Sequence, residues 1–103
     1  MSQKINGKSY KTSNGVTFKI LETEAYSKSK VSPQYKQILD YKSGLLVAIS
    51  YRASLIPNVT TENGVSRLRK VEIDGRVIDR PNAISTALGI TEGMKSYGMS
   101  EVK

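Results

Sequence analysis

Short runs of alternating apolar and polar residues, separated by turn residues, cover most of this chain and predict antiparallel β-strands. The clearest example covers residues 67–80, where two β-rich runs flank Asp74-Gly75. This dipeptide is typical of a two-residue hairpin loop. Such a loop sets Ile73 opposite Arg76 and so fixes the register of the whole hairpin.

This register has a consequence for charge, because it sets Arg69 opposite Arg80, with Arg67 further along the same face. Like charges directly opposite each other destabilise a strand pair. A bound anion would relieve the repulsion, since guanidinium groups match phosphate or carboxylate with two hydrogen bonds. The alternative is that Val71 and Ile78 face the core while the arginines extend into water.

A first hairpin is predicted from residues 4–12 and 16–22, with Asn14-Gly15 as a two-residue loop. Three apolar side chains of the second strand then point inward: Val16, Phe18 and Ile20. The opposite face carries Lys8, Tyr10, Thr12, Thr17 and Lys19. A tyrosine between lysines on an open sheet face is typical of single-stranded nucleic-acid binding, although an ordinary solvated face has the same composition.

The alternation is lost over residues 23–33, which we expect to form a basic loop that adds Lys28 and Lys30 to the positive charges. Further strands are predicted over residues 34–41 and 45–54. In the latter, the odd-numbered side chains form an almost wholly apolar face, predicted to be core: Leu45, Val47, Ile49, Tyr51 and Ala53.

Proline and glycine divide the rest of the chain. Pro57 is predicted to end the preceding strand, because proline cannot donate to a central ladder, and residues 58–65 then form a polar loop. After the 67–80 hairpin, Asn82 is expected to cap a helix that starts at residue 83, and Gly89 to end it.

The C-terminal part is predicted to contain a second short helical turn over residues 91–97, followed by frayed residues 99–103. The whole chain, 1–103, is then a single α+β domain. Its antiparallel sheet has about six strands built from three hairpins, with one or two short C-terminal helices. An incomplete barrel is the main alternative, and the pattern does not determine the strand order.

Composition removes several functional classes. The chain has no cysteine and no histidine, which excludes thiolate nucleophiles, Ser-His-Asp triads and the usual zinc sites. No glycine-rich phosphate loop is present, so we expect no enzyme activity, metal or cofactor. No apolar run approaches the roughly 18 residues of a membrane span. There is also no signal-peptide pattern, so the expected location is cytoplasmic, away from membranes.

The charge indicates a partner. Sixteen Lys and Arg against nine Asp and Glu give a net charge of +7, which favours binding to a polyanion. The leading hypothesis is therefore a small non-enzymatic protein that binds nucleic acid, single-stranded DNA or RNA, through phosphate contacts and tyrosine stacking. The predicted nucleic-acid-binding residues are Lys8, Tyr10, Lys19, Lys28, Lys30, Arg67, Arg69 and Arg80.

Two other hypotheses remain. The first is a protein-interaction, inhibitor or assembly module, of a size found in phages and mobile elements, that docks on a larger partner or forms a homo-oligomer. The Met-containing, glycine-broken C-terminal segment motivates it, because methionine adapts to irregular surfaces. The second is capture of a small anion by the arginines of the 67–80 hairpin: Arg67, Arg69, Arg76 and Arg80.

Overall fold

The computed structural model describes residues 5–26, 45–51, 54–61, 64–91 and 95–102. This part of the chain contains seven strands and one helix, in the order β1 (Ser9–Thr12), β2 (Thr17–Tyr26), β3 (Leu45–Tyr51), β4 (Ser54–Thr61), β5 (Gly64–Ile73), β6 (Arg76–Ile78), α2 (Pro81–Ala87) and β7 (Lys95–Val102). The expected strand over residues 34–41 lies outside the described residues, as do Lys28 and Lys30.

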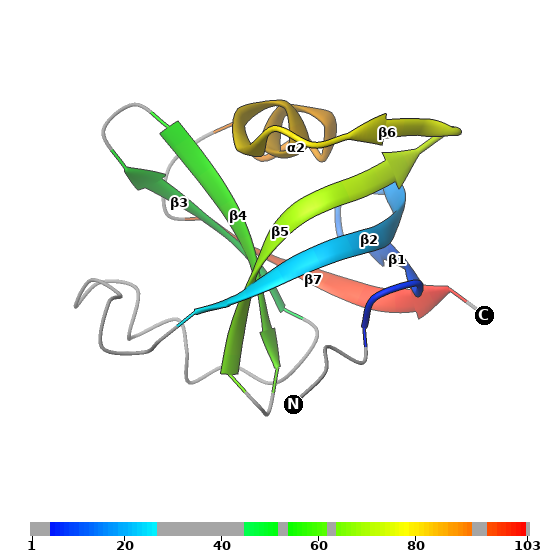
Figure 1. Cartoon of the computed structure of the whole chain (residues 1–103), viewed down its shortest axis with the longest axis horizontal. Coiled ribbons are helices and arrows are strands. Elements are labelled where there is room, and N and C mark those ends of the chain that lie inside the picture. Colours follow the sequence, from blue (N-terminus) through cyan, green and yellow to red (C-terminus); the bar gives the residue numbers. More distant parts are fainter. Residues whose placement is uncertain (1–4, 27–44, 52–53, 62–63, 92–94, 103) are drawn as a thin grey trace.

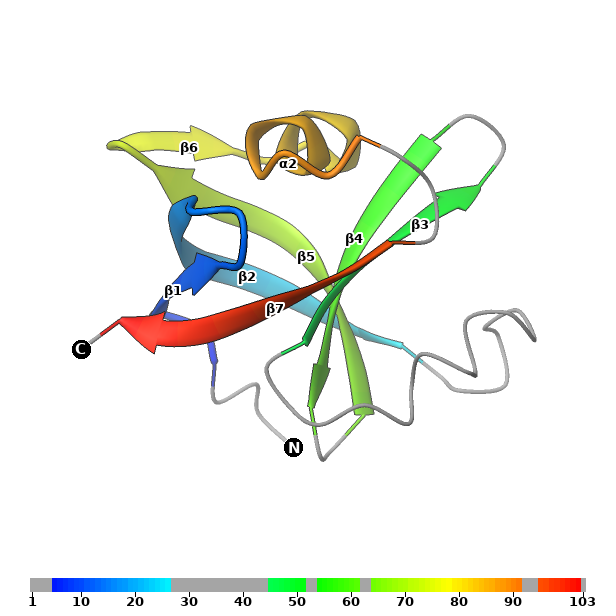
Figure 2. The same cartoon turned by 180° about the vertical axis from the view of Figure 1, so that it is seen from behind.

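The described strands form a closed antiparallel barrel (Figures 1 and 2). Their order is β2-β1-β7-β3-β4-β5-β6, and an additional pairing of β2 with β5 closes six of them into the barrel. The predicted sheet of three hairpins with one or two C-terminal helices was therefore wrong. Two of the three expected hairpins form, β1–β2 and β5–β6. The third was expected between residues 34–41 and 45–54, and its first strand lies outside the described residues; residues 45–51 pair with β4 and β7. Closure depends instead on β2–β5 and on β7, which pairs with both β1 and β3.

Strands β2 and β5 bend where they pair. Ile20 lies opposite Val71 and Thr23 opposite Leu68, but the register shifts twice in between. Leu21 and Arg69 are therefore extra residues on their two strands. Bulges of this kind bend a strand and increase its twist, which a small closed barrel requires.

The β1–β2 hairpin shows why its predicted register was wrong by one residue. Its loop has three residues rather than two, because the backbone N–H of Thr12 bonds to the carbonyl of Val16 at 2.9 Å and Gly15 has a φ of +98°. A glycine in the left-handed region at this position is typical of three-residue loops. Every β1 side chain therefore changes face, and Tyr10 lies opposite Phe18, inside the barrel.

Pro57 does not end a strand, and residues 58–61 and 64–65 of the predicted loop instead belong to β4 and β5. Pro57 lies opposite Ala48 of β3. It directly precedes the β4–β5 ladder, which begins where Asn58 pairs with Arg67. At this point β4 has a neighbouring strand on one side, so the missing N–H of proline is tolerated.

The barrel interior is filled by apolar side chains from the surrounding strands. Ile84 of α2 and Leu88, which directly follows the helix, belong to the same core cluster. In β3 the even-numbered face, which was not predicted to be core, contributes to this cluster. Leu46 and Ala48 belong to this cluster, whereas Val47 is buried outside it. The largest fully buried members are Phe18, Ile20, Leu46, Leu68, Ile84, Leu88 and Ile90.

Helix α2 lies at one end of the barrel, beside β4 and β6 (Figure 1). It begins at Pro81, and Asn82 does not cap it; the Asn82 Oδ1 instead accepts a hydrogen bond from the Leu55 N–H at 3.0 Å. Its predicted end at Gly89 is confirmed. The Gly89 N–H donates a hydrogen bond to the Thr86 carbonyl, and the Ile90 N–H donates one to the Ser85 carbonyl. With Gly89 at positive φ, this is the pattern of a glycine-terminated helix.

The C-terminal segment is a strand where a second helix was predicted. Lys95–Val102 forms β7, and residues 99–102, expected to be frayed, pair with β1 from Met99 opposite Thr12 to Val102 opposite Ser9. Similarly, residues 23–26 of the expected basic loop belong to β2, while residues 27–33 lie outside the described part of the chain.

Candidate functional site

The predicted hairpin around Asp74-Gly75 forms with the predicted register, and Ile73 pairs with Arg76. The arginine pair it was expected to present does not form. Strand β6 ends at Ile78, so Arg80 leaves the ladder and precedes α2.

Three other predicted cations, Arg69, Arg67 and Lys8, lie apart from one another, and two of them form ion pairs. Arg69 Nη1 lies 3.3 Å from Glu24 Oε1 on β2. Arg67 is half-buried, and its Nε is buried without a hydrogen-bond partner. Lys8 Nζ lies 3.7 Å from Glu101 Oε2 on β7. These cations therefore do not converge on one surface.

Tyr10 occupies the core rather than an open sheet face. Its exposed fraction is 7%, and its ring centroid lies 6.3 Å from that of Phe18. Burial, and to a smaller extent the charge of Glu101, raises the pKa of the Tyr10 hydroxyl above its ordinary value. In this barrel the ring is not available for a base to stack on it.

One predicted residue, Lys19, does lie on an exposed positive surface, which we call the β7–β1–β2 face. The register places Lys19 opposite Ser9 and Lys11 opposite both Thr17 and Ser100. Both lysines are exposed, and neither forms an ion pair with another described residue. Lys11 and Lys19 are diagonal neighbours across β1 and β2, and residues in this relationship are generally within about 7–8 Å of each other.

The surroundings of these lysines are small and mostly polar. Ser9, Thr17 and Ser100 alternate with the lysines on the β7–β1–β2 face. The acid nearest in register is Glu72, which lies opposite Lys19 on β5. The sequence analysis missed Lys11, because the two-residue loop it assumed would place the Lys11 side chain inside the barrel. A three-residue loop at the same turn predicts the observed, exposed position.

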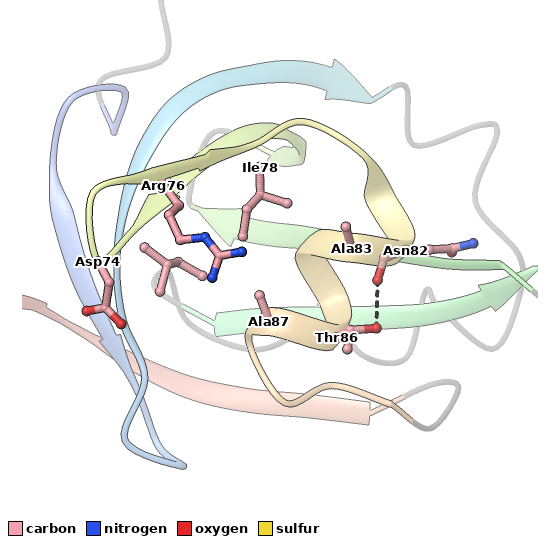
Figure 3. Close-up of a pocket in the computed structure, with 8 residues that line it drawn as sticks. Asp74, Arg76, Ile78, Asn82, Ala83, Thr86 and Ala87 are labelled. Carbon is pink, nitrogen blue, oxygen red and sulfur yellow. Dashed lines mark hydrogen bonds between the residues drawn. The ribbon is translucent and has the colours of Figure 1, made fainter.

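A second feature is a groove of about 480 Å³ between the tip of the β5–β6 hairpin and α2 (Figure 3). Ile73 and Ile78 supply apolar surface from the hairpin, and Ala83 and Ala87 supply it from the helix. Arg76 is the cation among the lining residues. The polar or charged remainder of the lining consists of Asp74, Asn82 and Thr86.

Other kinds of site are not found in the described residues. They include no cluster of three acidic side chains that could hold a metal ion. No described helix has the length and apolar character needed to cross a membrane. Comparison with protein-family models, with curated proteins and with solved structures found no match.

Proposed function

We propose that this protein is a non-enzymatic nucleic-acid-binding protein that contacts phosphate groups on its β7–β1–β2 face. The observation that carries the proposal is the pair of exposed lysines, Lys11 and Lys19, which have no ion-pair partner among the described residues. The hydroxyl side chains of Ser9, Thr17 and Ser100 lie opposite them in register, and Glu72 lies opposite Lys19 on β5. Ammonium and hydroxyl groups are the side chains that commonly contact the nucleic-acid backbone.

The whole-chain charge supports the same partner, since +7 on 103 residues favours association with a polyanion. Because Tyr10 is buried, the proposed contacts are electrostatic and carry little sequence preference. Lys28 and Lys30 remain predicted contributors from outside the described residues. Single-stranded DNA or RNA is the proposed ligand.

The proposal is tested by titrating a fluorescent single-stranded oligonucleotide and the matching duplex at several salt concentrations. The affinity should fall as salt rises, because bound cations displace counterions. Each lost phosphate contact makes the negative slope of log affinity against log salt shallower by about 0.7 for a single strand. Replacing both lysines, in K11Q/K19Q, should therefore make the slope shallower by about 1.4.

A matched control removes the same amount of charge from a different surface. Arg69 and Lys70 pair with Glu24 and Glu22 across β2 and β5, so R69Q/K70Q should leave the slope nearly unchanged. Equal slopes for the two double variants would show that binding depends on net charge alone, and the β7–β1–β2 face would then have no special role. Absence of binding by the unaltered protein at low salt would remove the proposed function.

A further inference from the structure

The groove between the β5–β6 hairpin and α2 is independent of the proposed nucleic-acid surface. Ile73, Arg76 and Ile78 share one face of the hairpin, because Ile73 pairs with Arg76 and Val71 with Ile78. In Figure 3 the Arg76 and Ile78 side chains point toward α2, on the side where Ala83 and Ala87 lie. The alanines are too small to fill the space, so the hairpin face is left uncovered there.

The polar groups of the helix do not supply the groove with a strong binding partner. The Thr86 hydroxyl donates a hydrogen bond to the Asn82 carbonyl at 2.9 Å, and the Asn82 Oδ1 accepts one from the Leu55 N–H. Arg76, in contrast, forms no ion pair with any described residue. Its guanidinium is therefore the group in this groove that a ligand can engage.

The edge of β6 offers a second kind of contact beside the groove. Among the described strands, β6 pairs with β5 alone. Ile73 and Arg76 flank a two-residue loop in which Asp74 and Gly75 both have positive φ. Such flanking residues exchange hydrogen bonds with each other, so the N–H and C=O groups of the next residue, Val77, point away from β5. Val77 is also the most exposed large apolar side chain of the described residues, at 60%.

We infer that this edge binds an extended segment of a partner protein, which adds a strand to β6 and places a carboxylate against Arg76. In such an arrangement the backbone of one partner residue pairs with the backbone of Val77, and the side chain of that partner residue covers the Val77 side chain. The side chains of the two partner residues on either side of it point toward the groove. One of these is apolar and packs on Ile78; the other is Asp or Glu and forms a charge-assisted hydrogen bond with the guanidinium.

The acidic residues near the groove restrict the position of that carboxylate. Asp74 and Asp79 lie just before and just after β6. In Figure 3 the Asp74 carboxylate points away from Arg76. An incoming carboxylate is repelled at both ends of the strand and attracted at Arg76, which fixes the register of the bound segment.

The test is selection of short peptides from a random displayed library on the full chain, followed by affinity measurement with the enriched peptide made synthetically. The enriched sequences should carry an acidic residue within a β-branched or apolar context. R76E should weaken binding about tenfold or more, the loss expected when a charge-assisted contact becomes repulsive. R69E, the same charge reversal on β5 but away from the groove, should leave the affinity within about twofold.

A second variant tests the strand pairing. V77P removes the N–H group that points to the open edge, while the β5–β6 ladder keeps its own bonds, so it should also weaken peptide binding about tenfold. Its unfolding transition is the check that the hairpin is intact. The inference is overturned if no peptide is enriched, if the enriched peptides lack a carboxylate, or if both variants bind normally. An oligonucleotide that displaces the peptide, and whose affinity falls in R76E as much as the affinity of the peptide does, would also overturn the inference. The groove would then be a nucleic-acid site.

Discussion

Replacing Gly89 by alanine tests the junction between α2 and the β1–β2 loop. Gly89 ends the helix with a φ of +79°, in the left-handed region that L-residues rarely adopt. A Cβ atom added there would lie close to the Asn14 side-chain nitrogen. That nitrogen donates a hydrogen bond to the Leu88 carbonyl at 2.9 Å. The substitution therefore strains the backbone and also displaces the side chain that connects the loop to the helix.

The magnitude follows from these two effects. Left-handed backbone costs an alanine about 1–2 kcal/mol, and loss of the Asn14–Leu88 hydrogen bond costs about 1 kcal/mol. G89A should lower the free energy of unfolding by about 2–3 kcal/mol. For a domain of this size, such a change lowers Tm by roughly 10–20 °C. Urea titration followed by circular dichroism measures the midpoint of unfolding and the dependence of the unfolding free energy on urea concentration, from which the change in stability is obtained.

Gly7 provides a matched control, because it also has a positive φ, +88°, but a Cβ there meets nothing within 4 Å. G7A should show the backbone cost alone, about 1–2 kcal/mol. In an N14A background, the loss of unfolding free energy caused by G89A should fall to the loss caused by G7A, since the side chain that the new Cβ would displace is absent. If G89A is no more destabilising than G7A, or if N14A does not reduce its effect, the contact between the loop and the helix end does not stabilise the protein.

Further predictions concern buried polar groups, with unfolding free energy as the measurement. Because burial, and secondarily Glu101, raises the pKa of Tyr10 above its ordinary 10.0, the neutral hydroxyl is favoured in the folded state. Its stabilisation is complete below pH 10 and is lost as pH rises further. The free energy of unfolding of Y10F should therefore fall less above pH 10 than that of the unaltered protein. An equal fall for both proteins would contradict this. T60V should be neutral or stabilising by about 1 kcal/mol, because the Thr60 hydroxyl is buried without a partner. T12V should be destabilising by about 1 kcal/mol, since the Thr12 hydroxyl accepts a hydrogen bond from the Val16 N–H. If T60V is instead the more destabilised of the two variants, the hydrogen-bonding described for the two hydroxyl groups is wrong.

Local chemistry was sufficient to predict some elements of the fold. Asp74-Gly75 adopts two consecutive left-handed residues, as such a loop requires, and every pair of the β5–β6 ladder follows from it. Gly89 likewise ends α2 through hydrogen bonds within a few residues of it. In both cases the residues that determine the structure are neighbours in the sequence, so no distant contact had to be known.

The β1–β2 loop shows where local chemistry is insufficient. Asn14-Gly15 fits a two-residue loop as well as the observed three-residue loop, in which glycine alone is left-handed. Contacts with distant residues accompany the observed form, because Asn14 binds the carbonyl of Leu88, 74 residues further along the chain. A shift of one residue exchanges the two faces of a strand. The prediction for Tyr10 failed for this reason, and Lys11 was missed with it.

The pairing of β2 with β5 overturns the predicted sheet of three hairpins and changes the surroundings of the predicted cations on β5. This pairing closes the barrel, and it also brings Glu22 within 3.7 Å of Lys70 and Glu24 within 3.3 Å of Arg69. Arg69, which the hairpin register alone would have set opposite Arg80, is thereby paired with an acid from a strand more than 40 residues earlier. The same pairing sets Glu72 opposite Lys19, and β7 contributes Ser100 opposite Lys11; neither lysine forms an ion pair with another described residue. A sequence reveals the amount of surplus charge, but long-range strand pairing determines which part of it remains unpaired on the surface.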